Sequence, residues 1–130
     1  MKRVLPDTNA ISSLFMGDEK VFNYLAEAEK IFMSVFVLAE LYTGFKGGNK
    51  EKQNRALLED FIIKNAVEIL NATMETAEIF AKIKNKLRTK SKPIPLNDVW
   101  IASHGIEYNA TIISYDKHFS SVEGVHIWTY

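Results

Sequence analysis

Short apolar segments alternate along this chain with longer segments whose apolar residues recur at helical spacing. The short segments predict buried strands over Lys2 to Leu5, Ile31 to Ser34, Val67 to Leu70, Thr111 to Ser114 and Val125 to Trp128. The longer ones predict a helix that begins at Ala10 and helices over Asp18 to Lys30, Val35 to Phe45, Lys50 to Ile63, Thr73 to Arg88 and Asn97 to Tyr108. Strands that alternate with helices indicate an α/β fold with a parallel sheet covered on both faces. We expect one domain over residues 1–130.

Four acids lie among apolar or small residues, unlike most other acids of the chain. Asp7 and Asp116 follow predicted strands, Asp98 opens a predicted helix, and Glu40 lies on a helix soon after a strand. Ligands of such sheets bind beyond the carboxyl ends of the strands. Converging carboxylates repel each other unless a cation neutralises them. Oxygen donors without cysteine favour magnesium or manganese over zinc, so we expect a Mg²⁺ or Mn²⁺ site.

The stretch around Asp98 predicts a rigid position for this acid. Pro93 and Pro95 end the preceding helix, because proline lacks an N–H and disfavours helical geometry in the residue before it. We expect Asn97 to cap the next helix and Asp98 to lie in its first turn. The helix dipole favours an ionised carboxylate there, which suits a metal ligand.

The charge balance limits how the chain can contact nucleic acid. Sixteen basic and sixteen acidic residues give no net charge, which excludes a broadly basic surface. Lys82 to Lys92 nevertheless carries six basic residues and no acid. It is either the solvated face of a helix or a strip that contacts phosphates, and Arg88, Lys90 and Lys92 are the predicted RNA contacts.

The apolar runs predict neither a signal peptide nor a membrane span. The first apolar run is too short for a signal peptide, and Ile31 to Phe45 is interrupted by polar residues. Absence of cysteine fits a reducing compartment. We expect a cytoplasmic protein.

The order and spacing of the acidic motifs resemble the PIN-domain ribonucleases, and most of all the VapC-type toxins of prokaryotic toxin–antitoxin pairs. The motifs that carry the resemblance are Asp7-Thr8-Asn9, Ala39-Glu40-Leu41 with Gly44, Asn97-Asp98 with Ile101-Ala102, and Ser114-x-Asp116 with Phe119. The resemblance implies a PIN-like three-layer α/β/α sandwich and a metal-dependent endoribonuclease that hydrolyses RNA. It also implies a homodimer inhibited by a cognate antitoxin protein.

The same resemblance assigns roles to individual residues. Asp7, Glu40, Asp98 and Asp116 match the metal-binding acids, and Thr8, Asn9 and Ser114 match the polar residues that orient them. Three positions depart from the pattern: Pro6 stands where the family commonly has another residue, Leu96 replaces a frequent acid, and His118 stands where an acid is frequent. We do not count His118 as a ligand. The sequence leaves open whether one metal ion binds or two.

Two other functions are compatible with an acidic α/β site. One is a Mg²⁺-binding phosphoryl-transfer or receiver-like domain, although such folds favour paired acids after the first strand and Asn9 stands here. The other is a catalytically inactive PIN-like module that only binds a partner. Taken singly, Asp98, Asp7, Asn9 and Ser114 would be capping or turn residues, and their joint occurrence favours the metal site.

Overall fold

The computed structural model describes residues 2–130 and contains a five-stranded sheet in the order β3-β2-β1-β4-β5. All four strand pairings are parallel. The strands are β1 (Arg3–Pro6), β2 (Lys30–Ser34), β3 (Glu68–Leu70), β4 (Thr111–Ile113) and β5 (His126–Ile127). The predicted parallel sheet is confirmed.

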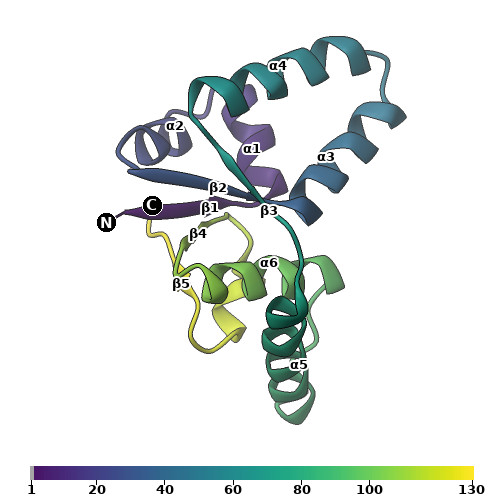
Figure 1. Cartoon of the computed structure of the whole chain (residues 1–130), viewed down its shortest axis with the longest axis vertical. Helices are drawn as coiled ribbons and strands as arrows, with labels where there is room; N and C mark the ends of the chain where they lie inside the picture. The colour runs from purple at the N-terminus through teal and green to yellow at the C-terminus, as the bar shows by residue number, and fades with distance from the viewer. Residues whose placement is uncertain (1) are drawn as a thin grey trace.

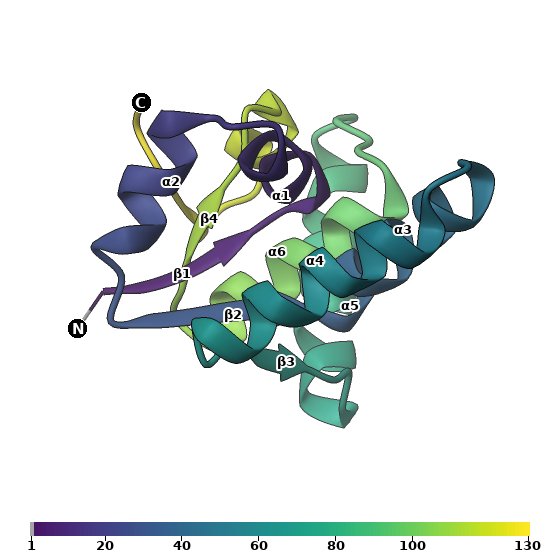
Figure 2. The same ribbon diagram turned by 90° about the horizontal axis from the view of Figure 1, so that it is seen from above.

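Helices cover both faces of this sheet. They are α1 (Thr8–Phe15), α2 (Glu19–Ala26), α3 (Val35–Gly47), α4 (Glu51–Lys64), α5 (Met74–Thr89), α6 (Leu96–Glu107) and the 3₁₀ helix η1 (Lys117–Ser121). Helices α1, α2 and α4 lie on one face with α3 beside them, and α5 and α6 lie on the other (Figures 1 and 2). The predicted three-layer α/β/α sandwich is therefore confirmed.

The central strand β1 places Asp7 beside β4, the strand that precedes Asp116. Pro6 is opposite Ile113 of β4, and the backbone N–H of Asp7 donates to the Ile113 carbonyl at 3.0 Å. Proline is tolerated here because the paired residues on the β2 side are Arg3 and Val4, before Pro6 is reached. The carboxyl ends of β1 and β4 thus bring residues 7 and 114–116 together.

The predicted N-cap of α6 was wrong. Asn97 lies inside α6, which begins at Leu96 after Pro95. Pro95 is extended, with φ −54° and ψ 143°, and its carbonyl accepts from the N–H groups of Asp98 and Val99. The chain therefore turns into the helix without a side-chain cap, and Asp98 still lies in the first turn as expected.

Other predicted boundaries shift by a few residues for local reasons. Helix α1 begins two residues before Ala10, because the Asp7 carboxylate caps it. Helix α2 ends at Ala26, four residues before the predicted end, and Lys30 already belongs to β2. Helix α3 ends at Gly47, two residues beyond the predicted end at Phe45. The 3₁₀ helix η1, capped by Asp116, was not predicted.

Helix α6 packs against the sheet with almost no exposed surface on its inner face. His104 is fully buried there, and its ring nitrogens contact Ser34 Oγ at 2.9 Å and the Asn71 carbonyl at 3.1 Å. On the flank of the helix, Trp100 stacks on both Phe36 and Phe80, with ring centroids 4.8 and 4.1 Å away. These contacts fix α6, and with it Asp98, relative to α3 and α5.

Within residues 2–130, no helix combines the length and the apolar character that crossing a membrane requires.

Candidate metal centre

The acids selected from the sequence lie at the ends of different elements. Asp7 follows β1 and caps α1, where its Oδ1 accepts from the Ala10 N–H at 2.8 Å. Asp116 follows β4 and caps η1, Asp98 lies in the first turn of α6, and Glu40 lies within α3. Elements from four parts of the chain therefore supply these carboxylates.

Two hydroxyl groups connect the acids to their surroundings. Ser114 Oγ donates to Asp7 Oδ2 and accepts from the backbone N–H of Asp116 at 2.9 Å. This serine ties the first acid to the last. Thr8 Oγ1 donates to Glu40 Oε1, which links α1 to α3. Asn9 lies in α1 with its side chain exposed.

The acids influence each other electrostatically. Asp7 is 5% exposed, and burial raises the pKa of its carboxyl to about 6 against the opposing hydrogen bonds from Ser114 and Ala10. The charges of Asp98 and Asp116 also contribute to this rise, less than burial does. The carboxylates of Asp7, Asp98 and Asp116 therefore interact electrostatically, and a divalent cation near them would be stabilised.

The pKa of Asp98 is also raised. Burial raises its pKa, the hydrogen bond to His118 lowers it, and the charges of Asp116 and Glu40 raise it. Glu40 is thereby connected to Asp98 by charge, and Asp7 is connected to Asp98 and Asp116. Asp7 is linked to Asp116 through Ser114, and Glu40 influences Asp98 by charge, while the role of all four acids as metal ligands stays a prediction.

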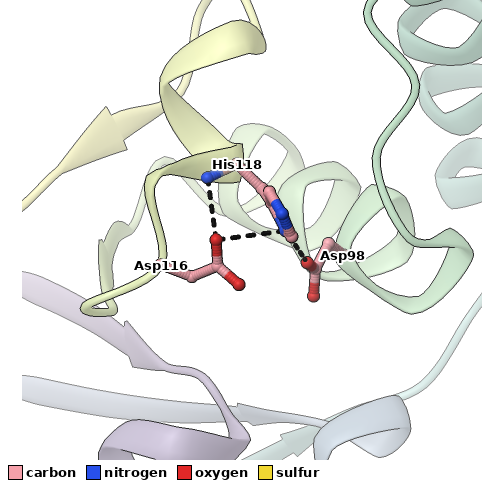
Figure 3. A group of neighbouring side chains, drawn as sticks. All are labelled: Asp98, Asp116 and His118. Atoms are coloured by element: carbon pink, nitrogen blue, oxygen red, sulfur yellow. Dashed lines mark hydrogen bonds and ion pairs between the residues drawn. The ribbon is translucent and has the colours of Figure 1, made fainter.

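The tightest cluster in this region contains a histidine. His118 Nδ1 lies 3.1 Å from Asp98 Oδ2 and 3.1 Å from Asp116 Oδ1 (Figure 3). One ligand atom of each residue lies within 4.8 Å of the other two, which suits a single metal ion. The sequence prediction assigned His118 no role. The sequence signal for it was only its position two residues after Asp116, because the turn that Asp116 caps was not predicted.

The predicted RNA-binding residues lie on the surface, in and after the last turn of α5. Arg88, Lys90 and Lys92 are exposed. Lys90 pairs with Glu123 at 2.6 Å, and Lys86 pairs with the same carboxylate at 3.2 Å. Part of the positive charge of this segment is therefore offset, and its contact with RNA stays a prediction.

An apolar groove of about 330 Å³ lies between α4 and the pair α1 and α2. Phe22 and Leu57, which line it, are 60% and 44% exposed. Its other lining residues are Leu14, Phe15, Leu25, Ala26, Asp60, Phe61, Lys64 and Asn65. Two of the lining rings, Phe15 and Phe61, meet edge to face with their centroids 5.9 Å apart.

Comparison with known families identifies the class of protein to which this parallel sheet, its helical layers and its acids belong. The family model of the PIN domain matches residues 4–125, and the chain belongs to this family. The resemblance noted from the acidic motifs is confirmed.

Within the family, the chain is similar to VapC proteins and to solved VapBC structures. Ribonuclease VapC1 of Haemophilus influenzae (strain R2866) is 28% identical over 121 residues, which is 89% of each chain. Ribonuclease VapC2 of Rickettsia felis is 33% identical over 90 residues, which is 69% of this chain and 66% of the relative. Among solved structures, VapBC2 from Rickettsia felis, bound to a DNA fragment from its promoter, contains a chain that matches with a TM-score of 0.87. That chain is 26% identical, and the match covers 98% of both chains.

Proposed function

We propose that this protein is a Mg²⁺- or Mn²⁺-dependent endoribonuclease that acts as the toxin of a toxin–antitoxin pair in the cytoplasm. The observation that carries the proposal is the cluster of Asp98, Asp116 and His118, to which Ser114 links Asp7 by hydrogen bonds. Burial and neighbouring charges raise the pKa values of Asp7 and Asp98 there. Relatives that are named ribonucleases, at 28% and 33% identity, support RNA as the substrate.

The donor set fits a hard divalent cation. One carboxylate oxygen each of Asp98 and Asp116 lies within 4.8 Å of the other, and the charge of Asp98 interacts with those of Asp7 and Glu40. A divalent ion supplies two things to phosphodiester hydrolysis when bound: it activates water at neutral pH and offsets charge on the phosphate. Ser114 and Thr8 orient the carboxylates of Asp7 and Glu40 through their hydrogen bonds.

The basic end of α5 supplies positive charge that the neutral total lacks. We assign Arg88, Lys90 and Lys92 to the RNA backbone, with Arg88 as the principal contact because a guanidinium grips phosphate with two donors. Lys90 shares its charge with Glu123, so we expect a smaller contribution from Lys90 than from Arg88.

The groove between α4 and the pair α1 and α2 is our candidate surface for the antitoxin. An amphipathic partner helix buries its apolar face in such a groove. The exposed ring of Phe22 and the exposed side chain of Leu57 would contact that apolar face. The solved VapBC2 structure that this chain resembles belongs to a family described as toxin–antitoxin systems, which supports a partner of this kind. We also propose a homodimer, as the family resemblance implies.

RNA cleavage by the purified chain tests the proposal. We expect cleavage with Mg²⁺ or Mn²⁺, none in EDTA, and none by Asp98→Ala with either ion. Glu59→Gln, which removes an exposed acid of α4, is the matched control and should cleave like the wild type. Cleavage that persists in EDTA, or that Asp98→Ala retains, would contradict the proposal. Formation of a phosphoaspartate from a small phosphodonor would instead favour the phosphoryl-transfer alternative.

A further inference from the structure

The imidazole of His118 faces the two carboxylates that are best placed to share a metal ion (Figure 3). We propose that His118 binds the ion directly through Nδ1, which makes this a mixed nitrogen and oxygen site that prefers Mn²⁺ over Mg²⁺. The inference rests on the proposed function, because it concerns the same ion.

The distances fit neighbouring ligands of one ion. In octahedral coordination at about 2.1 Å, adjacent ligand atoms lie about 3 Å apart. His118 Nδ1 lies 3.1 Å from Asp98 Oδ2 and 3.1 Å from Asp116 Oδ1. The nitrogen therefore lies at the spacing from both carboxylates that neighbouring ligands of one ion would have.

The backbone around His118 holds the ring in this position. The N–H of His118 donates to Asp116 Oδ1 at 2.9 Å, so the first turn of η1 is closed by a carboxylate of the cluster itself. The next residue, Phe119, is fully buried and anchors η1 in the core. Although the imidazole is 46% exposed, its backbone is fixed on both sides, and a prearranged ligand loses little conformational freedom on binding.

The donor type sets the expected preference among ions. Mg²⁺ takes oxygen ligands almost entirely, whereas imidazole binds transition metals more readily. Mn²⁺ accepts both kinds of donor. Leu96, in the first turn of α6, carries no donor atom, so a nitrogen at position 118 makes up a larger share of the available ligands.

Mn²⁺ and Mg²⁺ binding to the wild type, His118→Asp and His126→Asn tests this inference. His126 is exposed on β5, so His126→Asn is the matched control for loss of an imidazole. We expect His118→Asp to keep Mg²⁺ binding and to lower the ratio of Mn²⁺ affinity to Mg²⁺ affinity about tenfold, as measured by calorimetric titration. His126→Asn should leave that ratio unchanged. Circular dichroism and thermal unfolding in EDTA verify that the variants fold.

Pulsed electron paramagnetic resonance of bound Mn²⁺ detects the ligand itself. Coupling to a directly bound ¹⁴N should be present in the wild type and in His126→Asn, and absent in His118→Asp. Mn²⁺ that binds the wild type without ¹⁴N coupling would overturn the inference and leave the proposed function intact; His118 would then be an ion-pair partner that the metal displaces. A wild type that binds neither ion would overturn both.

Discussion

Replacing Asp7 with asparagine separates the effect of its buried charge on stability from the proposed role of that charge in metal binding. The pKa of Asp7 is raised from 3.8 to about 6 in the folded chain, mainly by burial. Between these values the folded state binds the proton more tightly than the unfolded state does, so stability falls as the pH rises from about 4 to about 6. At 1.36 kcal/mol for each pH unit, an ionised Asp7 costs the metal-free protein about 3 kcal/mol above pH 6.

Asparagine removes this cost, keeps the cap of α1 and reverses the direction of the hydrogen bond with Ser114. Its amide oxygen can still accept from the Ala10 N–H and cap α1, and its amide nitrogen can donate to Ser114 Oγ. In EDTA at pH 8 we therefore expect Asp7→Asn to raise the free energy of unfolding by up to about 3 kcal/mol. At pH 4 the gain should fall below about 1 kcal/mol, since Asp7 is then largely protonated in the folded state.

Urea unfolding in EDTA at the two pH values measures this difference. Asp18→Asn is the matched control, because Asp18 also caps a helix, but its hydrogen bond from Tyr115 lowers its pKa. Its ionised form is favoured in the folded state, so Asp18→Asn should lose stability at pH 8. With saturating Mn²⁺ the order should reverse, because the ion stabilises wild type and binds Asp7→Asn poorly. A gain for Asp7→Asn that is the same at pH 4 and pH 8, or a loss at pH 8, would refute the reasoning.

Three further changes test separate parts of the structure. His104→Leu should cost about 1–3 kcal/mol of unfolding free energy in urea titration, because Ser34 Oγ and the Asn71 carbonyl lose their buried partner; a neutral result would contradict this. Phe22→Asp should weaken inhibition by the antitoxin about tenfold in cleavage assays and leave cleavage without antitoxin unchanged; equal inhibition would exclude the groove as the docking surface. Arg88→Ala should weaken RNA binding and reduce the salt dependence of log K by about 0.7, as expected for one lost phosphate contact to a single strand; an unchanged slope would remove Arg88 from the interface.

The sequence predicted most of the fold because local and long-range signals agree. The short apolar runs of the strands and the helical spacing of apolar residues in α3 to α6 are signals that a few neighbouring residues carry. The alternation of these strands and helices along the chain then predicted the parallel sheet. The helix predicted to begin at Asp18 begins at Glu19, with Asp18 as its cap, for the same reason. The start of α6 was misplaced because two prolines already set the turn, and a capping side chain such as Asn97 was then unnecessary.

The membership of the site was harder to predict than the fold. Asp7 and Asp116 follow strands that pair in the sheet, so topology alone predicts that they meet. The approach of Asp98 and His118 depends on how η1 packs against α6, and η1 has no apolar periodicity that would predict it. His118 was set aside because the family pattern favours an acid there. The 3.1 Å contacts of its ring became visible only with the fold.

Anomalous diffraction from crystals soaked in Mn²⁺ is the most direct measurement of the claim that distant carboxylates assemble around a divalent ion. We predict a strong peak within bonding distance of Asp98 and Asp116, with Asp7 and Glu40 facing it, and loss of that peak in Asp98→Ala. Saturating Mn²⁺ that produces no peak among these side chains, or a peak that Asp98→Ala retains, would contradict the account.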